Sequence, residues 1–443
     1  MREFCEPVIA FAWNQEDLID ELRRDGFEAH VIPEHKREVA YNDIRRKIDI
    51  WFNRFCLKSP SRKIQQHYLD QFIPFKGKLL YKAREWYNIF KLSLPFYKKQ
   101  LLKREKQLLQ TSTNFNEIAA FVDSLHIDAV FTVTPFHKQE DILLRACKYK
   151  GKEMLTSILS FDNITKRGWI PVEYDLYIVW NKQNKEQLHR IYPYTKNKPV
   201  HICGPAQFDF YFDKQYLLSP CDWKKITGIT TSENRKIILY AGGPRELFPY
   251  EPLYLKEIDE AINKNLIHNK PLVLFRCHPM DNIERWKTAI GKSDNIIFED
   301  SWNGEQSPGY ANVSVEDIKK LCSTLAYTDV HINLCSTMTV DGSAFGKPQI
   351  GPAYVNNKKQ SSILLAKMYQ QEHFLPIIKT KGLSLACSPK ELILLINDAL
   401  KTKLSHQEKN CEILKSTISF CDGKSTERVA EAIEKFLMKE FDG

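Results

Sequence analysis

The chain has 443 residues, of which 43% are hydrophobic and 27% are charged, and its formal net charge is +9. A chain of this length is too long for one ordinary hydrophobic core, which predicts two domains, or about three at most. The composition is that of a globular protein, and no apolar run approaches the roughly 20 residues that a membrane-spanning helix needs. The eleven cysteines are scattered without a Cys-x-x-Cys pair, which predicts neither a zinc site nor a disulfide framework. The N-terminus also lacks a signal-peptide pattern, so we expect a reduced, cytoplasmic protein.

Strand and helix patterns alternate in the first part of the chain. Apolar runs at 7–12 and 27–32 flank a helix pattern at 16–24, and this βαβ order is typical of a parallel sheet. The alternation resumes after residue 115 and predicts a turn at 134–137, at the carboxyl end of a strand. The later elements are expected as strands at 128–133, 176–180 and 200–203 and as helices at 116–125, 139–150 and 184–192.

Residues 36–110 interrupt this alternation with long, charged and aromatic helical patterns. Between residues 76 and 107 there are ten Lys and Arg against two Glu, interleaved with aromatic residues. Such a stretch is commonly a solvated helical face with its aromatics turned inward. The alternative is a surface for anionic lipid headgroups or phosphorylated acceptors. Nucleic acid is not expected as a partner, because no recognised nucleic-acid module accompanies the run.

The alternation restarts after residues 213–234, which carry little pattern and are expected to form a linker. Strands are predicted at 236–241, 271–276 and 295–298 and helices at 254–264, 315–327 and 427–437. The sequence therefore predicts two doubly wound α/β domains with a cleft between them as the binding site. The expected boundaries are 1–212 for the first domain, with 36–110 as its helical insertion, 235–405 for the second domain and 406–443 for C-terminal helices.

The segment Asp329–Ile350 reads as a strand, a loop, a helix and a second strand. Ser336, Thr337 and Thr339 stand where the helix begins, and such residues cap free backbone N–H groups. The same N–H groups and the helix dipole can bind a phosphate. An ordinary capped helix of an α/β core would have the same pattern.

Several turns resemble those of bacterial GT-B glycosyltransferases, a class built from two Rossmann-like domains that face each other across a cleft. The most similar members are surface-polysaccharide glycosyltransferases, with CDP-glycerol glycerophosphotransferases and non-hydrolysing UDP-N-acetylglucosamine 2-epimerases as related families. The resemblance covers most of the chain outside 36–110. It rests on Ser160–Gly168, Val179–Asn181, Gly204–Asp209, Arg276–Pro279 and Asn333–Asp341.

The resemblance implies that the second domain holds a nucleotide-linked donor and the first domain holds the acceptor. By position, Asp341 would lie near the ribose, although this class more often has Glu there. Residues 335–342 lack the glycine-rich turn and paired Glu of the epimerases, so epimerisation is disfavoured. The donor-binding residues implied are Gly242, Gly243, Arg245, His278, Asp300, Ser336, Thr337, Thr339 and Asp341. Those on the acceptor side are Asn163, Trp13 and Asn14.

Transfer chemistry also needs a base for the acceptor hydroxyl and a positive or N–H-rich environment for the leaving group. Asp162 and His137 follow strands of the first domain and are the candidate bases. Asp162 could equally be an Asx-turn residue, and a lone His such as His137 is more often a surface residue or a cap. His278 follows a strand of the second domain, where it could contact phosphate or sugar. No Asp-x-Asp pattern is present, so we expect no catalytic metal.

These arguments predict a metal-independent glycosyltransferase without a resident cofactor. It would move a sugar from a nucleotide donor to a surface-polysaccharide or lipid-linked acceptor. It would lie in the cytoplasm, at the inner face of the membrane if residues 76–107 bind anionic lipid. The alternatives are a 2-epimerase-like isomerase, a polyol-phosphate transferase and a non-catalytic nucleotide- or glycan-binding module.

Overall fold

A computed structural model describes residues 4–11, 16–72, 75–299, 306–307, 310–311, 313–355, 357, 360–401 and 406–439. The chain forms an α/β structure with parallel sheets, as the sequence predicts, and it divides into two compact units. Unit 1 consists of Met1–Ser59, Ile73–Pro205 and Thr426–Gly443. Unit 2 consists of Pro60–Phe72 and Ala206–Ser425.

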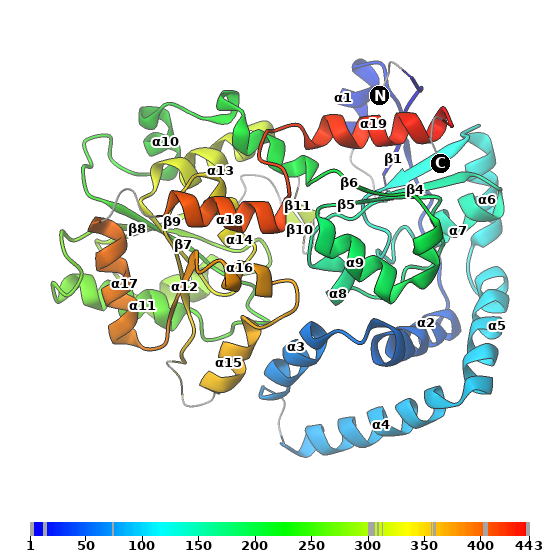
Figure 1. Ribbon diagram of the computed structural model, residues 1–443, viewed down its shortest axis with the longest axis horizontal. Helices are drawn as coiled ribbons and strands as arrows, with labels where there is room; N and C mark the ends of the chain where they lie inside the picture. The colour runs from blue at the N-terminus through cyan, green and yellow to red at the C-terminus, as the bar shows by residue number, and fades with distance from the viewer. Residues whose placement is uncertain are drawn as a thin grey trace. The chain divides into compact units, whose positions relative to one another are not determined.

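Unit 1 contains a four-stranded parallel sheet and a separate parallel strand pair (Figure 1). The sheet has its strands in chain order: β3 (Ala129–Thr132), β4 (Glu153–Ser157), β5 (Leu176–Val179) and β6 (Val200–Ile202). The pair is β1 (Val8–Phe11) and β2 (Glu28–Val31). The helices are α1 (Glu16–Arg24), α2 (Val39–Trp51), α4 (Phe75–Ser93), α5 (Pro95–Thr111), α6 (Phe115–Ser124), α7 (Asp141–Tyr149), α8 (Asn163–Lys166), α9 (Lys182–Ile191) and α19 (Ser425–Leu437), with a π-helix η1 (Phe52–Leu57) and a 3-10 helix η2 (Pro193–Asn197).

Apolar side chains cover both faces of this sheet. One face packs in a core with α2, α5, α6 and α7. The other face packs against α19, whose Ala432 and Ile433 lie with Leu155 and Ile178 in one buried cluster. The C-terminal helix, expected as part of a separate segment at 406–443, is therefore part of the core of unit 1.

The segment 36–110 is helical, as expected, but not all of it belongs to the first unit. Helix α3 (Pro60–Asp70) packs in unit 2, where Tyr68 is fully buried and its ring contacts Phe248 at a centroid distance of 5.8 Å. The Ser61 hydroxyl accepts a hydrogen bond from the Glu372 N–H at 2.7 Å. The sequence showed the helical periodicity but not which of the two cores α3 would join.

Unit 2 contains a six-stranded parallel sheet in the order β14-β13-β12-β7-β8-β9. Two Rossmann-like halves diverge from the central pair β7 and β12, and open α/β sheets bind ligands at the carboxyl ends of the strands at this switch point. The strands are β7 (Ile237–Ala241), β8 (Leu272–Arg276), β9 (Ile296–Glu299), β12 (Val330–Asn333), β13 (Gln349–Pro352) and β14 (Leu383–Ala386). A short antiparallel pair is formed by β10 (Gln306–Ser307) and β11 (Tyr310–Ala311).

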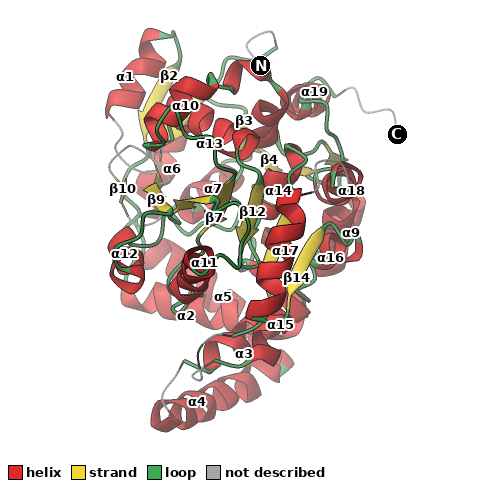
Figure 2. Ribbon diagram, turned by 90° about the vertical axis from the view of Figure 1, so that its left-hand side faces the viewer, coloured by secondary structure: helices red, strands yellow, loops and turns green. Residues whose placement is uncertain are grey.

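Helices cover both faces of the six-stranded sheet, which makes unit 2 doubly wound (Figures 1 and 2). Alternate residues of β7 serve the two faces: Ile238 packs with α11 and α17, and Ile237 packs with α10. The helices are α10 (Pro220–Thr227), α11 (Pro252–Asn263), α12 (Ile283–Ile290), α13 (Val315–Tyr327), α14 (Met338–Ala344), α15 (Ser362–Met368), α16 (Leu375–Lys379), α17 (Pro389–Lys401) and α18 (Gln407–Thr417), with 3-10 helices η3 (Ala206–Phe212) and η4 (Lys214–Tyr216).

The expected linker at 213–234 is an integral part of unit 2. Helix α10 lies within it, and Trp223 is only 1% exposed. The Trp223 indole N–H donates to the Thr324 hydroxyl at 3.0 Å. A buried, hydrogen-bonded Trp anchors this segment to α13, so it is not a free connection.

None of the helices in the described ranges combines the length and apolar character needed to cross a bilayer.

Candidate functional site

The carboxyl ends of four neighbouring strands form one row across the sheet of unit 2. Asn333 of β12 pairs with Ala241 of β7, Ala241 with Arg276 of β8, and Arg276 with Glu299 of β9. Residues paired in this way direct their side chains to the same face of a sheet. We call these four residues the terminal row. It runs across the switch point, which is where a ligand is expected in such a sheet.

The terminal row contains buried charges that are held by mutual contacts. Arg276, Glu299 and Lys320 are at most 5% exposed. Glu299 Oε1 lies 3.3 Å from Arg276 Nη1 and 3.0 Å from Lys320 Nζ, which α13 supplies. A carboxylate shared by two cations fixes the ends of β8 and β9 relative to α13, because breaking a buried pair leaves an uncompensated charge.

Asp341 of α14 is linked to the same region. Its Oδ1 accepts a hydrogen bond from the Tyr211 hydroxyl at 2.5 Å. Burial raises the pKa of Asp341 to about 6, while the hydrogen bond from Tyr211 and the charge of Arg276 oppose this rise. The expected role of Asp341 at a ribose stays a prediction.

The turn after β7 is packed too tightly for any residue larger than glycine at 243. A Cβ atom at Gly243 would lie 2.6 Å from Phe248 Cδ2, and one at Gly242 would lie 3.0 Å from Trp286 Cζ2. The N–H groups of both glycines are already used, by the Arg276 carbonyl and by Glu251 Oε2. Gly242 and Gly243 therefore shape the turn in this structure, and their expected place beside a diphosphate stays a prediction. Arg245, in contrast, is exposed.

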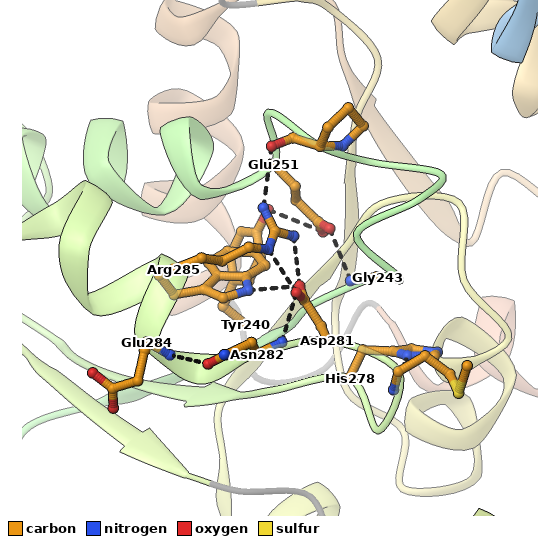
Figure 3. A network of polar contacts seen from close by, with 11 residues as sticks. Tyr240, Gly243, Glu251, His278, Asp281, Asn282, Glu284 and Arg285 are labelled. Atoms are coloured by element: carbon orange, nitrogen blue, oxygen red, sulfur yellow. Dashed lines mark hydrogen bonds and ion pairs between the residues drawn. The ribbon is translucent and has the colours of Figure 1, made fainter. Parts of the chain in front are cut away.

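The carboxyl group of Glu251 fixes the turn after β7. It is 1% exposed, accepts the Gly243 N–H at 2.8 Å, and lies 3.4 Å from the Tyr240 hydroxyl (Figure 3). Burial raises the pKa of Glu251 to about 8, and the Gly243 hydrogen bond and the charge of Arg285 only partly oppose this rise. The carboxyl group is therefore largely protonated near neutral pH.

The turn after β8 presents His278. Its Nδ1 accepts a hydrogen bond from the Met280 N–H at 3.0 Å, so the neutral ring carries its proton on Nε2. Burial lowers the pKa of His278, and Asp281 opposes this shift. Asp281 itself is fixed by a two-point ion pair with Arg285 and by the Trp286 indole N–H at 2.8 Å (Figure 3). His278 is thus a neutral donor on a rigid turn.

The turn between β12 and α14 is organised by Asn333. Its Oδ1 accepts hydrogen bonds from the Ser336 N–H and the Thr339 hydroxyl, both at 3.1 Å. Thr339 is fully buried, so the expectation that it binds phosphate is wrong for this conformation. Ser336 is partly exposed and Thr337 is exposed. Ser336 Oγ accepts a hydrogen bond from the Met338 N–H at 3.2 Å.

The acceptor-side candidates lie in unit 1. Asp162 is partly buried, and its Oδ2 lies 3.2 Å from Lys166 Nζ. His137 lies in the turn between β3 and α7, and Asp162 lies after β4, so the two loops leave neighbouring strands at the same edge of the sheet. Asn163 is only 7% exposed, which corrects its expected contact with an acceptor in this conformation. The predicted site residues Trp13, Asn14 and Asp300 lie outside the described residues.

Sequence reasoning did not select Glu251, Glu299, Lys320 or Tyr211, and it gave no role to Arg276. A signal existed for Arg276 and Glu299, because each charge ends an otherwise apolar strand. Lys320 and Tyr211 come from helical segments and Glu251 immediately precedes one, and nothing in the sequence relates them to the strand ends. Within the described ranges, no cluster of His, Cys, Asp and Glu has an arrangement that could hold a metal ion.

The sequence model of the CDP-Glycerol:Poly(glycerophosphate) glycerophosphotransferase family matches residues 151–435, which is more than half of the chain. No curated protein matches the chain. Among solved structures, a putative UDP-N-acetylglucosamine 2-epimerase from Listeria monocytogenes is 15% identical with a TM-score of 0.50, over 74% of this chain and 79% of that chain.

Two further solved structures are similar at lower scores. A glycosyltransferase from Rickettsia africae is 15% identical with a TM-score of 0.45, over 79% of this chain and 83% of that chain. The wall teichoic acid polymerase TagF is 16% identical with a TM-score of 0.39, over 61% of this chain and 59% of that chain. The resemblance noted in the sequence is thus confirmed, by the family match and by the fold shared with the epimerase.

Proposed function

This chain belongs to the CDP-glycerol:poly(glycerophosphate) glycerophosphotransferase family, a family of transferases, and we propose that it transfers a glycerophosphoryl group from a CDP-linked donor to a growing surface polymer. The family match carries this proposal, because it spans nearly all of unit 2 and the part of unit 1 that contains Asp162. The donor and the acceptor are taken from the family's description.

The proposed reaction is a displacement at phosphorus. A hydroxyl oxygen of the acceptor forms a new bond to the glycerol-bearing phosphorus of CDP-glycerol. The bond between that phosphorus and the bridging oxygen of the diphosphate breaks, and CMP leaves with the electron pair. The acceptor proton passes to a base of the protein. Negative charge grows on the leaving phosphate, so catalysis requires donors placed around it.

We assign the donor to the carboxyl edge of the sheet in unit 2. Ser336, Thr337, Arg245 and His278 are accessible to solvent at least in part and offer hydroxyl, guanidinium and imidazole donors to the two phosphates. The buried terminal row and Asp341 hold the turns that carry these groups. This arrangement can stabilise a leaving phosphate through the protein's own donors, and we propose a metal-independent reaction.

We assign the base to Asp162, with His137 as the alternative. An ionised carboxylate accepts a proton from a hydroxyl that it contacts, and Lys166 Nζ lies 3.2 Å from Asp162 Oδ2. Asp162 and His137 lie in loops that follow neighbouring strands. A variant at each position can therefore be assayed with the same acceptor.

Sugar transfer from a nucleotide donor, the function predicted from the sequence, is the second candidate. The likeness to the epimerase is a likeness of fold, and a shared fold does not by itself indicate a nucleotide-sugar reaction. The released nucleotide separates the candidates. Glycerophosphoryl transfer releases a nucleoside monophosphate, whereas glycosyl transfer releases a nucleoside diphosphate. A 2-epimerase would convert a nucleotide sugar without an acceptor, and a binding module would release nothing.

We also propose that α4 contacts an anionic membrane surface. Several of its large apolar side chains are exposed: Leu79 by 69%, Trp86 by 68%, Tyr87 by 59% and Phe90 by 68%. Positions 79, 86, 87 and 90 fall on one side of a helix, and Figure 2 shows α4 reaching beyond α2 and α5 of the same unit. Exposed aromatics among lysines are typical of a helix that lies in the headgroup region.

The test is product analysis on the purified chain. CDP-glycerol and a glycerophosphate polymer are supplied, and the released nucleotide is identified by chromatography. CMP release that depends on the polymer supports the proposal, and Asp162→Asn should slow it by about two to four orders of magnitude while nucleotide binding remains. Release of a nucleoside diphosphate from a nucleotide sugar would favour the second candidate instead. No turnover with either donor, despite nucleotide binding, would favour a binding module.

A further inference from the structure

Unit 1 contains a buried cluster of charged side chains beside the loops that carry Asp162 and His137. Arg45 of α2, Glu105 of α5, and Asp141 and Arg145 of α7 are each at most 9% exposed. Asp141 opens α7 directly after the turn that contains His137. The cluster therefore lies at the carboxyl edge of β3 and β4, where this unit is expected to bind its ligand.

Two arginines and two carboxylates in the cluster form ion pairs with one another. Arg145 contacts Asp141 Oδ1 and Glu105 Oε1, each at 2.7 Å, and Arg45 Nη2 lies 3.3 Å from Asp141 Oδ2. Burial acts against the charged form of Asp141, but Arg145 and Arg45 outweigh it and lower the pKa of this carboxyl. The two acids of the cluster are thus fully used as partners of two arginines.

Aromatic side chains line the same cluster. Trp169, which follows the loop of Asp162, lies over both guanidinium groups, at 4.8 Å from Arg45 and 5.4 Å from Arg145. The Tyr41 hydroxyl is within 3.5 Å of Asp141 and 3.4 Å of Glu105. These contacts connect the cluster to the loop after β4 as well as to the turn after β3.

Arg37 is a third arginine in this environment, and no carboxylate of the described ranges forms an ion pair with it. Among the described residues, neither its Nε nor its Nη2 has a hydrogen-bond partner, although both atoms are buried. Burial lowers the pKa of Arg37, and the nearby Asp141 only partly opposes this shift. The cluster therefore has three guanidinium groups against two carboxylates. Nε and Nη2 form the edge of a guanidinium that binds two oxygens of one anion.

We infer that Arg37 and the adjoining cluster of Arg45 and Arg145 form a binding site for a tetrahedral oxyanion, a phosphate group. One bound anion would use the free edge of Arg37 and balance the excess positive charge. The site adjoins the loops that carry Asp162 and His137, so the phosphate of a glycerophosphate unit in the acceptor is the source that we favour. That choice of source rests on the proposed function, whereas the anion site itself does not.

The test measures phosphate binding to the full chain by calorimetry and by thermal unfolding. It is made in the Ser336→Ala/Thr337→Ala background, so that binding at the proposed donor site does not contribute. Inorganic phosphate and glycerol 3-phosphate are the two probes. The variants are Arg37→Lys, which keeps the charge but removes the two-donor edge, and Arg37→Gln, which removes both. Arg46→Gln is the matched control, because Arg46 is exposed and paired with Asp43 on α2.

We expect saturable phosphate binding in the parent protein and in Arg46→Gln, about tenfold weaker binding in Arg37→Lys, and none in Arg37→Gln. Without phosphate, Arg37→Gln should unfold at the same temperature as its parent or higher, because an unpaired buried charge is costly. Tighter binding of glycerol 3-phosphate than of inorganic phosphate would identify an acceptor subsite, and equal binding a site for free phosphate.

Phosphate binding that persists in Arg37→Gln would overturn the inference, as would the absence of binding in the parent protein. A large loss of stability in Arg37→Gln without phosphate would also overturn it, because Arg37 would then be a satisfied member of the core. Activity decides a separate question. If the site binds phosphate but the chain releases no CMP, the proposed function fails and the anion site stands.

Discussion

Replacing Glu251 by Gln should make the protein more stable at alkaline pH and change its pH dependence. Glu251 is 1% exposed, and burial raises its pKa to about 8 from an ordinary value of 4.5. The native state therefore binds one proton more than the unfolded state between these two values, so stability falls as pH rises through this window. The amide of Glu251→Gln can accept the Gly243 N–H in the same way and never ionises.

The size of the effect follows from the width of the window. Each unit of difference between folded and unfolded pKa corresponds to about 1.4 kcal/mol. As the pH rises from the ordinary pKa of Glu to the raised pKa of about 8, the free energy of unfolding of the wild type falls by about 5 kcal/mol. Glu251→Gln keeps this stability. Below the ordinary pKa of Glu, the two proteins should differ only by the quality of their hydrogen bonds.

Urea unfolding followed by tryptophan fluorescence, from about pH 5 to about pH 8, measures this difference. The gain of Glu251→Gln over wild type should grow by about 1.4 kcal/mol per pH unit across this range. Glu246→Gln removes a carboxylate at an exposed position of the same loop and should not reproduce this growth. A gain that stays constant with pH would refute the reasoning, because it would mean that Glu251 is ionised in the folded protein throughout.

Three further outcomes test the proposed function. Ser336→Ala/Thr337→Ala should lose most of the thermal stabilisation that CMP or CDP gives the wild type, which is about 2.7 kcal/mol at a hundredfold excess over the dissociation constant; an undiminished shift would remove these hydroxyls from the donor site. Asp162→Asn should lower kcat by about two to four orders of magnitude while KM for the donor stays unchanged, and a loss confined to KM would argue for a binding role only. Trp86→Ala/Phe90→Ala should reduce cosedimentation with vesicles of anionic phosphatidylserine several-fold and leave binding to neutral vesicles unchanged; equal binding by both proteins would contradict the membrane contact of α4.

The sequence alone determined the class of the fold, because the signal is local. An apolar run such as Ile237–Ala241 is too short for a buried helix and is flanked by turn residues, so it reads as a buried strand. Helix α13 was predicted over its full length, and the structure shows that Ser314 caps its start. The order of these elements along the chain carried the family resemblance in the same way.

The assignment of each element to a core was decided by tertiary structure. Helix α3 has the periodicity of its neighbours, yet its Tyr68 is buried in unit 2. Helix α19 is distant in sequence from β4 and β5 but covers one face of their sheet. Contacts of this kind depend on which apolar faces meet, and no local pattern records them.

The same distinction holds for the candidate sites. Ser336 and Thr337 could be selected because hydroxyl residues at a strand–helix turn are a local signal for capping or phosphate binding. The same signal was misleading at Thr339, because its hydroxyl is buried against Asn333. Arg37 and Glu251 could not be selected at all. Each is an ordinary charged residue in the sequence, and its properties arise from burial and from partners far along the chain, which only the folded structure brings together.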